Sequence, residues 1–196
     1  MVLRFLTAAL FCEGPEDDAF LSPVLERQLR RLGMAGKGFE FESVVSQGCL
    51  TAKVESGRLD EYIIETAQSF DLVFLHNDDD QRQKCVHRDD RLDGKISSHA
   101  RTVNVIPVRE TEAWALVDRG ALPGGGEGQA LPTRAREVEK IPDPKVILRQ
   151  ALGRRYSPEL AEAVGLGISL DRLAEVPAYQ SFLQDLTAAL KELNFL

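Results

Sequence analysis

The feature that most constrains the fold is an almost continuous apolar stretch over residues 2–11, interrupted only by Arg4 and Thr7. A strand with one face in water alternates apolar and polar residues, whereas a strand covered on both faces is apolar throughout. Strands of the second kind belong to parallel sheets with helices on both sides. The stretch therefore predicts a buried first strand in an α/β fold.

Helical and extended patterns alternate after this strand. Apolar residues at helical spacing predict a helix over residues 17–32, with Pro15 and acidic residues before it and Gly33 after it. Further strands are predicted at residues 39–45, 71–76 and 101–108, and a further helix at residues 60–70. This order predicts an α/β fold with a mainly parallel sheet of about four strands, flanked by helices.

The pattern changes after residue 120. Residues 120–132 contain five glycines and two prolines, which predicts a loop. Helices are predicted at residues 144–152, 158–164 and 177–193, with a short helical turn near residues 170–173. We therefore expect an α/β core over residues 1–120, a loop and linker over residues 121–142, and a helical C-terminal subdomain over residues 143–196 that packs on the core.

Composition excludes several classes of protein. The longest mainly apolar run, residues 5–12 with Thr7 inside it, is far shorter than the ~20 residues that a membrane-spanning helix needs, so no membrane partner is expected. The chain has three cysteines, an odd number at wide spacing, which does not suit a disulfide framework. The cysteine count instead favours a reducing, cytoplasmic location.

Acidic side chains follow three of the predicted strands: Glu13 and Asp17 the first, the triple aspartate at residues 78–80 the third, and Glu110 and Glu112 the fourth. The carboxyl ends of parallel strands meet at one edge of a sheet, where open α/β proteins bind their ligands. Carboxylates gathered there repel one another unless a cation neutralises them, and Mg²⁺ or Mn²⁺ prefers oxygen ligands. We therefore predict a metal site that activates water as the attacking group.

Each acidic group also has a structural interpretation. Asp17 is equally suited to capping the helix that begins beside it, the triple aspartate to a solvated loop, and the Glu-x-Glu pair to the start of an amphipathic helix. The metal interpretation is favoured because all three groups fall at predicted strand ends.

Several of these segments resemble a known family. Residues 11–17, with Glu13-Gly14-x-x-Asp17, resemble the strand and E-G-x-x-D motif that opens the TOPRIM domain, and Asp78-x-Asp80 resembles its D-x-D motif. Residues 106–118 resemble the E-A-W-x-L-x-D stretch of the TOPRIM-like domain of unknown function 4276 family. Residues 143–145, Tyr156 and residues 177–183 fit the tail of that family, so the resemblance spans nearly the whole chain.

The resemblance implies a TOPRIM-like, Rossmann-like fold and a site of known type, as in the overcoming-lysogenization-defect nucleases. The implied catalytic residues are Glu13, Asp78 and Asp80. The implied ligands of Mg²⁺ or Mn²⁺ are the same three residues together with Asp17 and Glu112.

Three further residues stay open as members of this site. Asp79 is an alternative in the D-x-D motif, because Asn77-x-Asp79 has the same spacing. Glu110 is an alternative to Glu112, and Asp118 either completes the site or caps a turn.

The acidic balance of the chain, a net charge of −7, counts against binding nucleic acid through bulk charge. Residues 1–80 carry 7 basic and 15 acidic side chains, but residues 81–101 carry 6 basic and 3 acidic ones. In that basic segment Arg82, Lys84, Arg88 and Arg91 are predicted to bind nucleic acid, because phosphate contacts supply much of the affinity. The alternative is a solvated polar loop.

The leading hypothesis is a metal-dependent nuclease, or phosphodiester hydrolase, that acts on nucleic acid, with DNA favoured over RNA. The resemblance implies a bacterial phage-defence or DNA-repair effector with an ABC-type ATPase partner. The alternative is a non-catalytic TOPRIM-like interaction module in a two-gene defence or repair complex. A flavodoxin-like nucleotide sensor is disfavoured because acidic residues, not glycine-rich amide nests, follow the strands.

Overall fold

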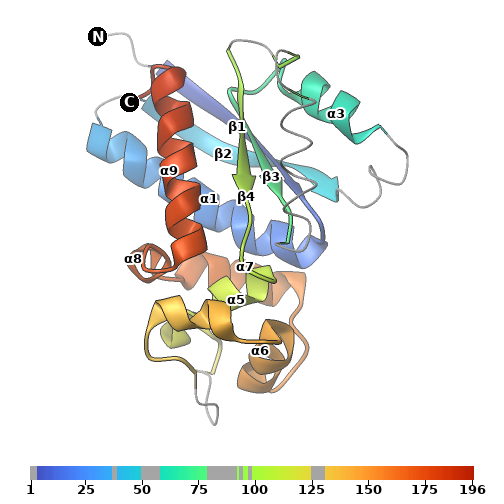
Figure 1. Cartoon of the computed structure of the whole chain (residues 1–196), viewed down its shortest axis with the longest axis vertical. Coiled ribbons are helices and arrows are strands. Elements are labelled where there is room, and N and C mark those ends of the chain that lie inside the picture. The colour runs from blue at the N-terminus through green and yellow to red at the C-terminus, as the bar shows by residue number, and fades with distance from the viewer. Residues whose placement is uncertain are drawn as a thin grey trace.

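The strands form one four-stranded, all-parallel sheet in the order β2-β1-β3-β4 in the computed structural model (Figure 1). The structure describes residues 4–36, 39–49, 58–78, 92, 95–96, 99–124 and 131–196. The strands are β1 (Arg4–Cys12), β2 (Phe39–Cys49), β3 (Leu72–His76) and β4 (Arg101–Val105). The predicted α/β fold with a parallel sheet is confirmed.

Helices flank the sheet and make up the described C-terminal part of the chain. They are α1 (Pro15–Gly36), α3 (Leu59–Thr66), α5 (Thr111–Ala115), α6 (Pro144–Leu152), α7 (Pro158–Gly167), α8 (Leu170–Leu173) and α9 (Pro177–Glu192). Two short 3₁₀ helices, η2 (Arg119–Ala121) and η3 (Ala135–Lys140), lie between α5 and α6. Every predicted helix is present, and α5 begins within the Glu-x-Glu pair, as the structural interpretation of that pair expects. Helix η3 was not predicted because it is too short to show helical periodicity.

Both faces of the sheet are covered, which explains the continuous apolar first strand. Leu10 and Phe74, on one face, belong to a large hydrophobic cluster that also contains side chains of α1 and α9. Phe11 and Val73, on the other face, belong to a second cluster that contains Ile63 of α3. Successive strand residues thus alternate between two buried faces, and neither face can carry a regular polar pattern.

The fourth strand is shorter than predicted, ending at Val105 instead of residue 108. Pro107 follows it and has no backbone N–H for a ladder hydrogen bond. Arg109 then adopts a left-handed φ of 68°, and the Glu110 N–H donates to the Val108 carbonyl at 3.0 Å. This tight turn redirects the chain into α5.

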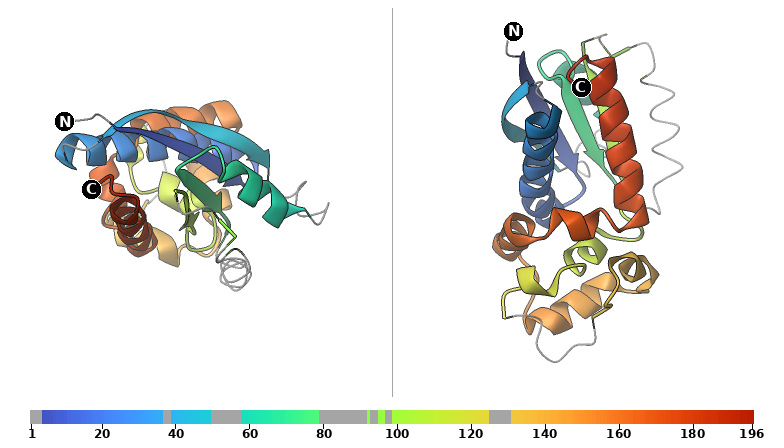
Figure 2. Two further views of the ribbon diagram at one scale, coloured as in Figure 1. Left: turned by 90° about the horizontal axis from the view of Figure 1, so that it is seen from above. Right: turned by 90° about the vertical axis from the view of Figure 1, so that its left-hand side faces the viewer.

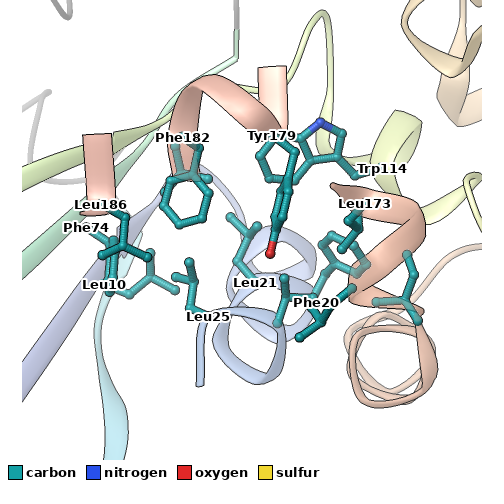
Figure 3. Close-up of a cluster of buried hydrophobic side chains, with 14 of the residues drawn as sticks. Leu10, Phe20, Leu21, Leu25, Phe74, Trp114, Leu173, Tyr179, Phe182 and Leu186 are labelled. Carbon is teal, nitrogen blue, oxygen red and sulfur yellow. The ribbon is translucent and has the colours of Figure 1, made fainter. Parts of the chain in front are cut away.

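An aromatic cluster joins α5 to the helices on the sheet (Figure 3). Trp114 of α5 is fully buried and packs edge-on against Tyr179 of α9, with ring centroids 5.1 Å apart. The Tyr179 hydroxyl donates to Gln28 of α1 at 3.3 Å. Because α5 begins where the acidic residues after β4 lie, this cluster anchors one side of the candidate site to the core.

Two of the C-terminal helices pack closely on the α/β part. Helix α7 packs on α1, and α9 lies along β4, as Figures 1 and 2 show. Helices α5, α6 and α7 lie beyond the end of the sheet towards which β4 points (Figure 1). None of the described helices combines the length and apolar composition needed to cross a membrane.

Gly165 allows α7 to approach α1 closely. A Cβ atom at this position would collide with the Phe20 carbonyl oxygen and would lie 2.8 Å from Cγ of Pro23, both on α1. The Arg27 guanidinium of α1 donates to the Gly165 carbonyl at 2.9 Å, which fixes the same crossing. Since α7 follows the loop that contributes to the candidate site, this crossing also sets the position of that loop.

We expect Gly165→Ala to lower the free energy of unfolding by about 1–3 kcal/mol, the usual cost of overpacking a close contact. The matched control is Gly167→Ala at the end of the same helix, where a Cβ would lie 3.7 Å from Ala121 Cβ, an ordinary contact. Both substitutions add helix propensity, so only the clash differs between them. Urea unfolding of both variants measures the difference, and equal stabilities would contradict the close-packing argument.

Candidate metal centre

The centre of the sheet has the topology at which open α/β proteins bind ligands. β1 and β3 are neighbours, but β1 leads through α1 to β2 on one side, and β3 leads to β4 on the other. Connections that leave in opposite directions open a crevice at the carboxyl ends of the two strands. Glu13 directly follows β1, and Asp78 lies two residues after β3. Both side chains are thus placed at this crevice by the strand order.

A cavity of about 530 Å³ lies at this point, and we call it the switch-point cavity. Its acidic lining consists of Glu13, Glu16, Asp17, Asp78 and Glu112. The structure therefore brings together four of the five predicted metal ligands. Asp80 and its alternative Asp79 lie outside the described residues, as do the predicted nucleic-acid-binding residues Arg82, Lys84, Arg88 and Arg91.

Three basic side chains and one tyrosine from the C-terminal part of the chain line the same cavity. Lys145 and Arg149 come from α6, and Arg155 and Tyr156 come from the loop between α6 and α7. Lys145 and Arg149 are four residues apart and so share one face of the helix. Sequence reasoning missed Lys145, Arg149 and Tyr156 as site residues; the i,i+4 pair of cations was the available signal.

Asp17 caps α1 and also reaches across to α5. Its Oδ2 accepts a hydrogen bond from the Gly14 backbone N–H at 3.0 Å, as the third helical residue does in a capping box. Its Oδ1 accepts from the Thr111 hydroxyl at 2.6 Å. Of the two interpretations of Asp17, the structure therefore gives direct support to the cap.

His76 is completely buried at the end of β3. Its Nε2 lies 2.9 Å from the Thr111 hydroxyl oxygen. Because a carboxylate oxygen can only accept, the Thr111 hydroxyl donates its hydrogen bond to Asp17. The same hydroxyl oxygen then accepts a hydrogen bond from Nε2–H of His76. Burial lowers the pKa of His76, against the opposing charge of Asp17, which favours the neutral imidazole. The hydrogen bond to Thr111 then places the proton of that imidazole on Nε2.

Two carboxyl groups in the switch-point cavity are strongly perturbed. Burial raises the pKa of Asp78 to about 8, and the charges of Asp17 and Glu13 add to the effect. Burial raises the pKa of Glu112 to about 7, although Lys145 opposes the shift. Carboxyl groups of this kind either hold protons near neutral pH or require a cation beside them.

Lys145 is the cation that partly compensates them. Its Nζ lies 3.0 Å from Oε1 of Glu110. Burial alone would lower the pKa of Lys145, but the hydrogen bond to Glu110 and the charges of Glu112, Glu110 and Asp78 outweigh it and raise the pKa. Glu110 thus pairs with Lys145 and lines a neighbouring cavity of about 780 Å³ instead of the switch-point cavity. Of the Glu110 and Glu112 alternatives, it is Glu112 that reaches the cavity.

Asp118 has a capping role. Its Oδ1 accepts from the Gly120 N–H at 3.0 Å at the start of η2, and its Oδ2 accepts from the Ser169 N–H at 3.0 Å before α8. It is not among the residues that line the switch-point cavity. Of the two alternatives for Asp118, the structure supports the turn cap.

The carboxylates fit a hard divalent cation by their chemistry. Asp78 Oδ1 and Glu112 Oε2 are buried and have no hydrogen-bond partner in the part of the chain that the structure describes. Buried charges of this kind are normally paired or coordinate a metal. Among the described residues, no three His, Cys, Asp or Glu side chains lie close enough together to hold one ion. Glu13, Asp78 and Glu112 are the lining residues that would hold Mg²⁺ or Mn²⁺.

Comparisons of the chain with protein-family models, with curated proteins and with solved structures found no match. The function must therefore be argued from the residues of the switch-point cavity.

The pKa shifts predict how stability changes with pH when no metal is bound. Asp78 and Glu112 bind their protons more tightly in the folded protein than in the unfolded chain, where their pKa values are 3.8 and 4.5. Their contribution is therefore complete near pH 4 and is lost as the pH rises to 8. Water screens part of the electrostatic penalty at Asp78, so we expect the free energy of unfolding to fall by about 2 kcal/mol over this pH range.

Urea unfolding in a chelator between pH 5 and 8 measures this loss. We expect Asp78→Asn to flatten the decline, and saturating Mg²⁺ to offset it in the unsubstituted protein. Asp171→Asn is the control, because the Asp171 side chain is 79% exposed on α8, away from the switch-point cavity. A decline that is equally steep in Asp78→Asn would contradict the assignment.

Proposed function

We propose that the chain is a metal-dependent nuclease of the TOPRIM type, which hydrolyses phosphodiester bonds of nucleic acid, with DNA favoured over RNA. The observation that carries the proposal is the mixed lining of the switch-point cavity. Carboxylates suited to a divalent cation and cationic side chains suited to phosphate share that one cavity. The TOPRIM resemblance of the segments around Glu13 and Asp78 supports the same chemistry.

The mixed lining matters because a phosphodiester is an anion. Carboxylates alone would repel it, whereas a divalent cation bound to them offsets their negative charge. Lys145, Arg149 and Arg155 add positive charge in the same cavity. Arginine can also bind phosphate oxygens through two parallel hydrogen bonds, which orients the group as well as attracting it.

The roles of the residues follow from their chemistry. A bound Mg²⁺ or Mn²⁺ polarises a phosphoryl oxygen and lowers the pKa of a coordinated water. Glu13, Asp78 and Glu112 would hold that ion, and Glu110 orients Lys145 through their 3.0 Å ion pair. Burial raises the pKa of Tyr156, so its phenol stays protonated and can donate a hydrogen bond to a phosphate oxygen. Its hydroxyl has no partner among the described residues, which leaves it available for this contact.

The cleavage assay uses supercoiled plasmid, single-stranded DNA and RNA with Mg²⁺ or Mn²⁺. We expect cleavage by the unsubstituted protein. We expect the cleavage rate of Glu13→Gln and of Asp78→Asn to be lower by at least about 100-fold, as for loss of a catalytic carboxyl group. Asp118→Asn is the matched control, because Asp118 caps η2 outside the cavity. The proposal fails if no substrate is cut even with an ABC-type ATPase partner present, or if both cavity variants cut normally.

Measurements of DNA binding distinguish an arginine that lines the cavity from one that does not. We expect Arg155→Ala to weaken DNA binding and to reduce the slope of log affinity against log salt concentration by about 1, because one phosphate contact is lost. Arg154→Ala is the matched control, since Arg154 is adjacent in sequence but is not among the residues lining the cavity. Fluorescence anisotropy of labelled DNA in Ca²⁺, at several salt concentrations, measures both variants. Identical slopes in the two variants would contradict a role for the cavity in phosphate binding.

A second function, a non-catalytic TOPRIM-like interaction module, is favoured by one observation. The described carboxylates line one cavity without three of them converging on a single point. For such a module, we expect that the protein binds a partner equally well with and without Asp78→Asn and that no substrate is cut.

A further inference from the structure

A continuous chain of hydrogen bonds runs beneath the switch-point cavity. His76 Nε2 lies 2.9 Å from the Thr111 hydroxyl oxygen, which lies 2.6 Å from Asp17 Oδ1. The other carboxylate oxygen of Asp17 accepts from the Gly14 N–H at 3.0 Å. His76 and Thr111 are both buried, with 0% and 3% of their surface exposed. Neither residue lines the cavity, and the proposed chemistry does not use either of them directly.

Each group in this chain lies beside a carboxylate of the candidate centre. Gly14 directly follows Glu13, Thr111 directly precedes Glu112, and His76 lies two residues before Asp78. These residues belong to three different elements: the turn into α1, the start of α5 and the end of β3. The chain therefore ties together the three backbone segments that carry Glu13, Asp78 and Glu112.

We propose that His76 and Thr111 are positioning residues, which set the separation of Glu13, Asp78 and Glu112 through Asp17 and so determine how tightly the centre binds a divalent cation. The inference rests on the proposed metal centre. Residues that orient metal ligands through hydrogen bonds typically change metal affinity or activity by about 10- to 100-fold when they are removed.

Threonine suits the middle of the chain for two reasons. Its hydroxyl is both a donor and an acceptor, so it can join a carboxylate to an imidazole N–H at the same time. Its branched Cβ restricts the side-chain rotamer, and the buried surroundings strengthen each hydrogen bond. Valine has nearly the same shape but can make neither bond, whereas serine keeps both.

The test measures Mn²⁺ affinity by isothermal titration calorimetry on the full chain. We expect Thr111→Val to weaken binding by about 10- to 100-fold and Thr111→Ser to restore most of the loss. Thr187→Val is the matched control: it removes a hydroxyl that donates to the Leu183 carbonyl at 2.7 Å on α9, away from the cavity. A thermal melt of each variant separates weaker metal binding from loss of folded protein.

A second variant keeps the inference testable if Thr111→Val does not fold. His76→Gln retains an amide that can donate to Thr111 but lacks the fixed imidazole geometry, and we expect it to weaken Mn²⁺ binding less than Thr111→Val and more than Thr111→Ser. If Thr111→Val and His76→Gln bind Mn²⁺ as tightly as the unsubstituted protein, the positioning role is overturned while the metal centre stands. If the unsubstituted protein binds no Mn²⁺, the metal centre and the positioning role are both overturned.

Discussion

The arrangement depends on the burial of β1 between two neighbouring strands and two layers of helices. Strands β2 and β3 lie on either side of β1, and hydrophobic clusters cover both of its faces. Polar side chains next to this strand are therefore expected where the chain turns at the end of the strand. Glu13-Gly14 forms that turn, and the crossover of α1 to one side and of β3 and β4 to the other leaves a crevice there. The apolar stretch at the start of the chain thus decides both the fold and the location of the acidic cavity.

This location creates an electrostatic conflict that the rest of the cavity partly resolves. Strand ends bring Glu13, Asp78 and Glu112 together, and the low polarity of the surroundings penalises their charges. Lys145 offsets the repulsion, and Glu110 keeps Lys145 charged and in place. With Arg149 and Arg155, the cavity holds three cationic side chains against five carboxyl groups, and the difference of two is the charge that one divalent cation would offset. The overall charge of −7 is thus compatible with an anionic substrate at this one place.

The part of the site that lies at strand ends was predictable, because the burial pattern of strands and the chemistry of acidic turns are both local properties. Glu13, Asp17 and Asp78 follow from these patterns, and so does the Glu110 and Glu112 pair, although the patterns do not show that Glu112 is the one that reaches the cavity. Lys145, Arg149 and Tyr156 do not, because α6 reaches the cavity only through the packing of α5 on α6 and of α7 on α1. The sequence shows His76 at the end of a buried strand, where an apolar residue is more usual, but it does not show the role of His76, because its partner Thr111 lies 35 residues away.

A helix-capping aspartate and a metal-binding aspartate are hard to tell apart in a sequence. Asp17 and Asp118 are both acidic residues near the start of a helix, and both accept backbone N–H hydrogen bonds. What distinguishes them is the second oxygen: in Asp118 it accepts from the backbone N–H of Ser169 before α8, whereas in Asp17 it accepts from the hydroxyl of the buried Thr111. A carboxylate that caps one helix and fixes another can shape a metal site without touching the ion. The helical C-terminal part supplies the cations of the cavity, from α6 and the loop after it, whereas the carboxyl groups come from α1, from α5 and from the segments that follow β1 and β3.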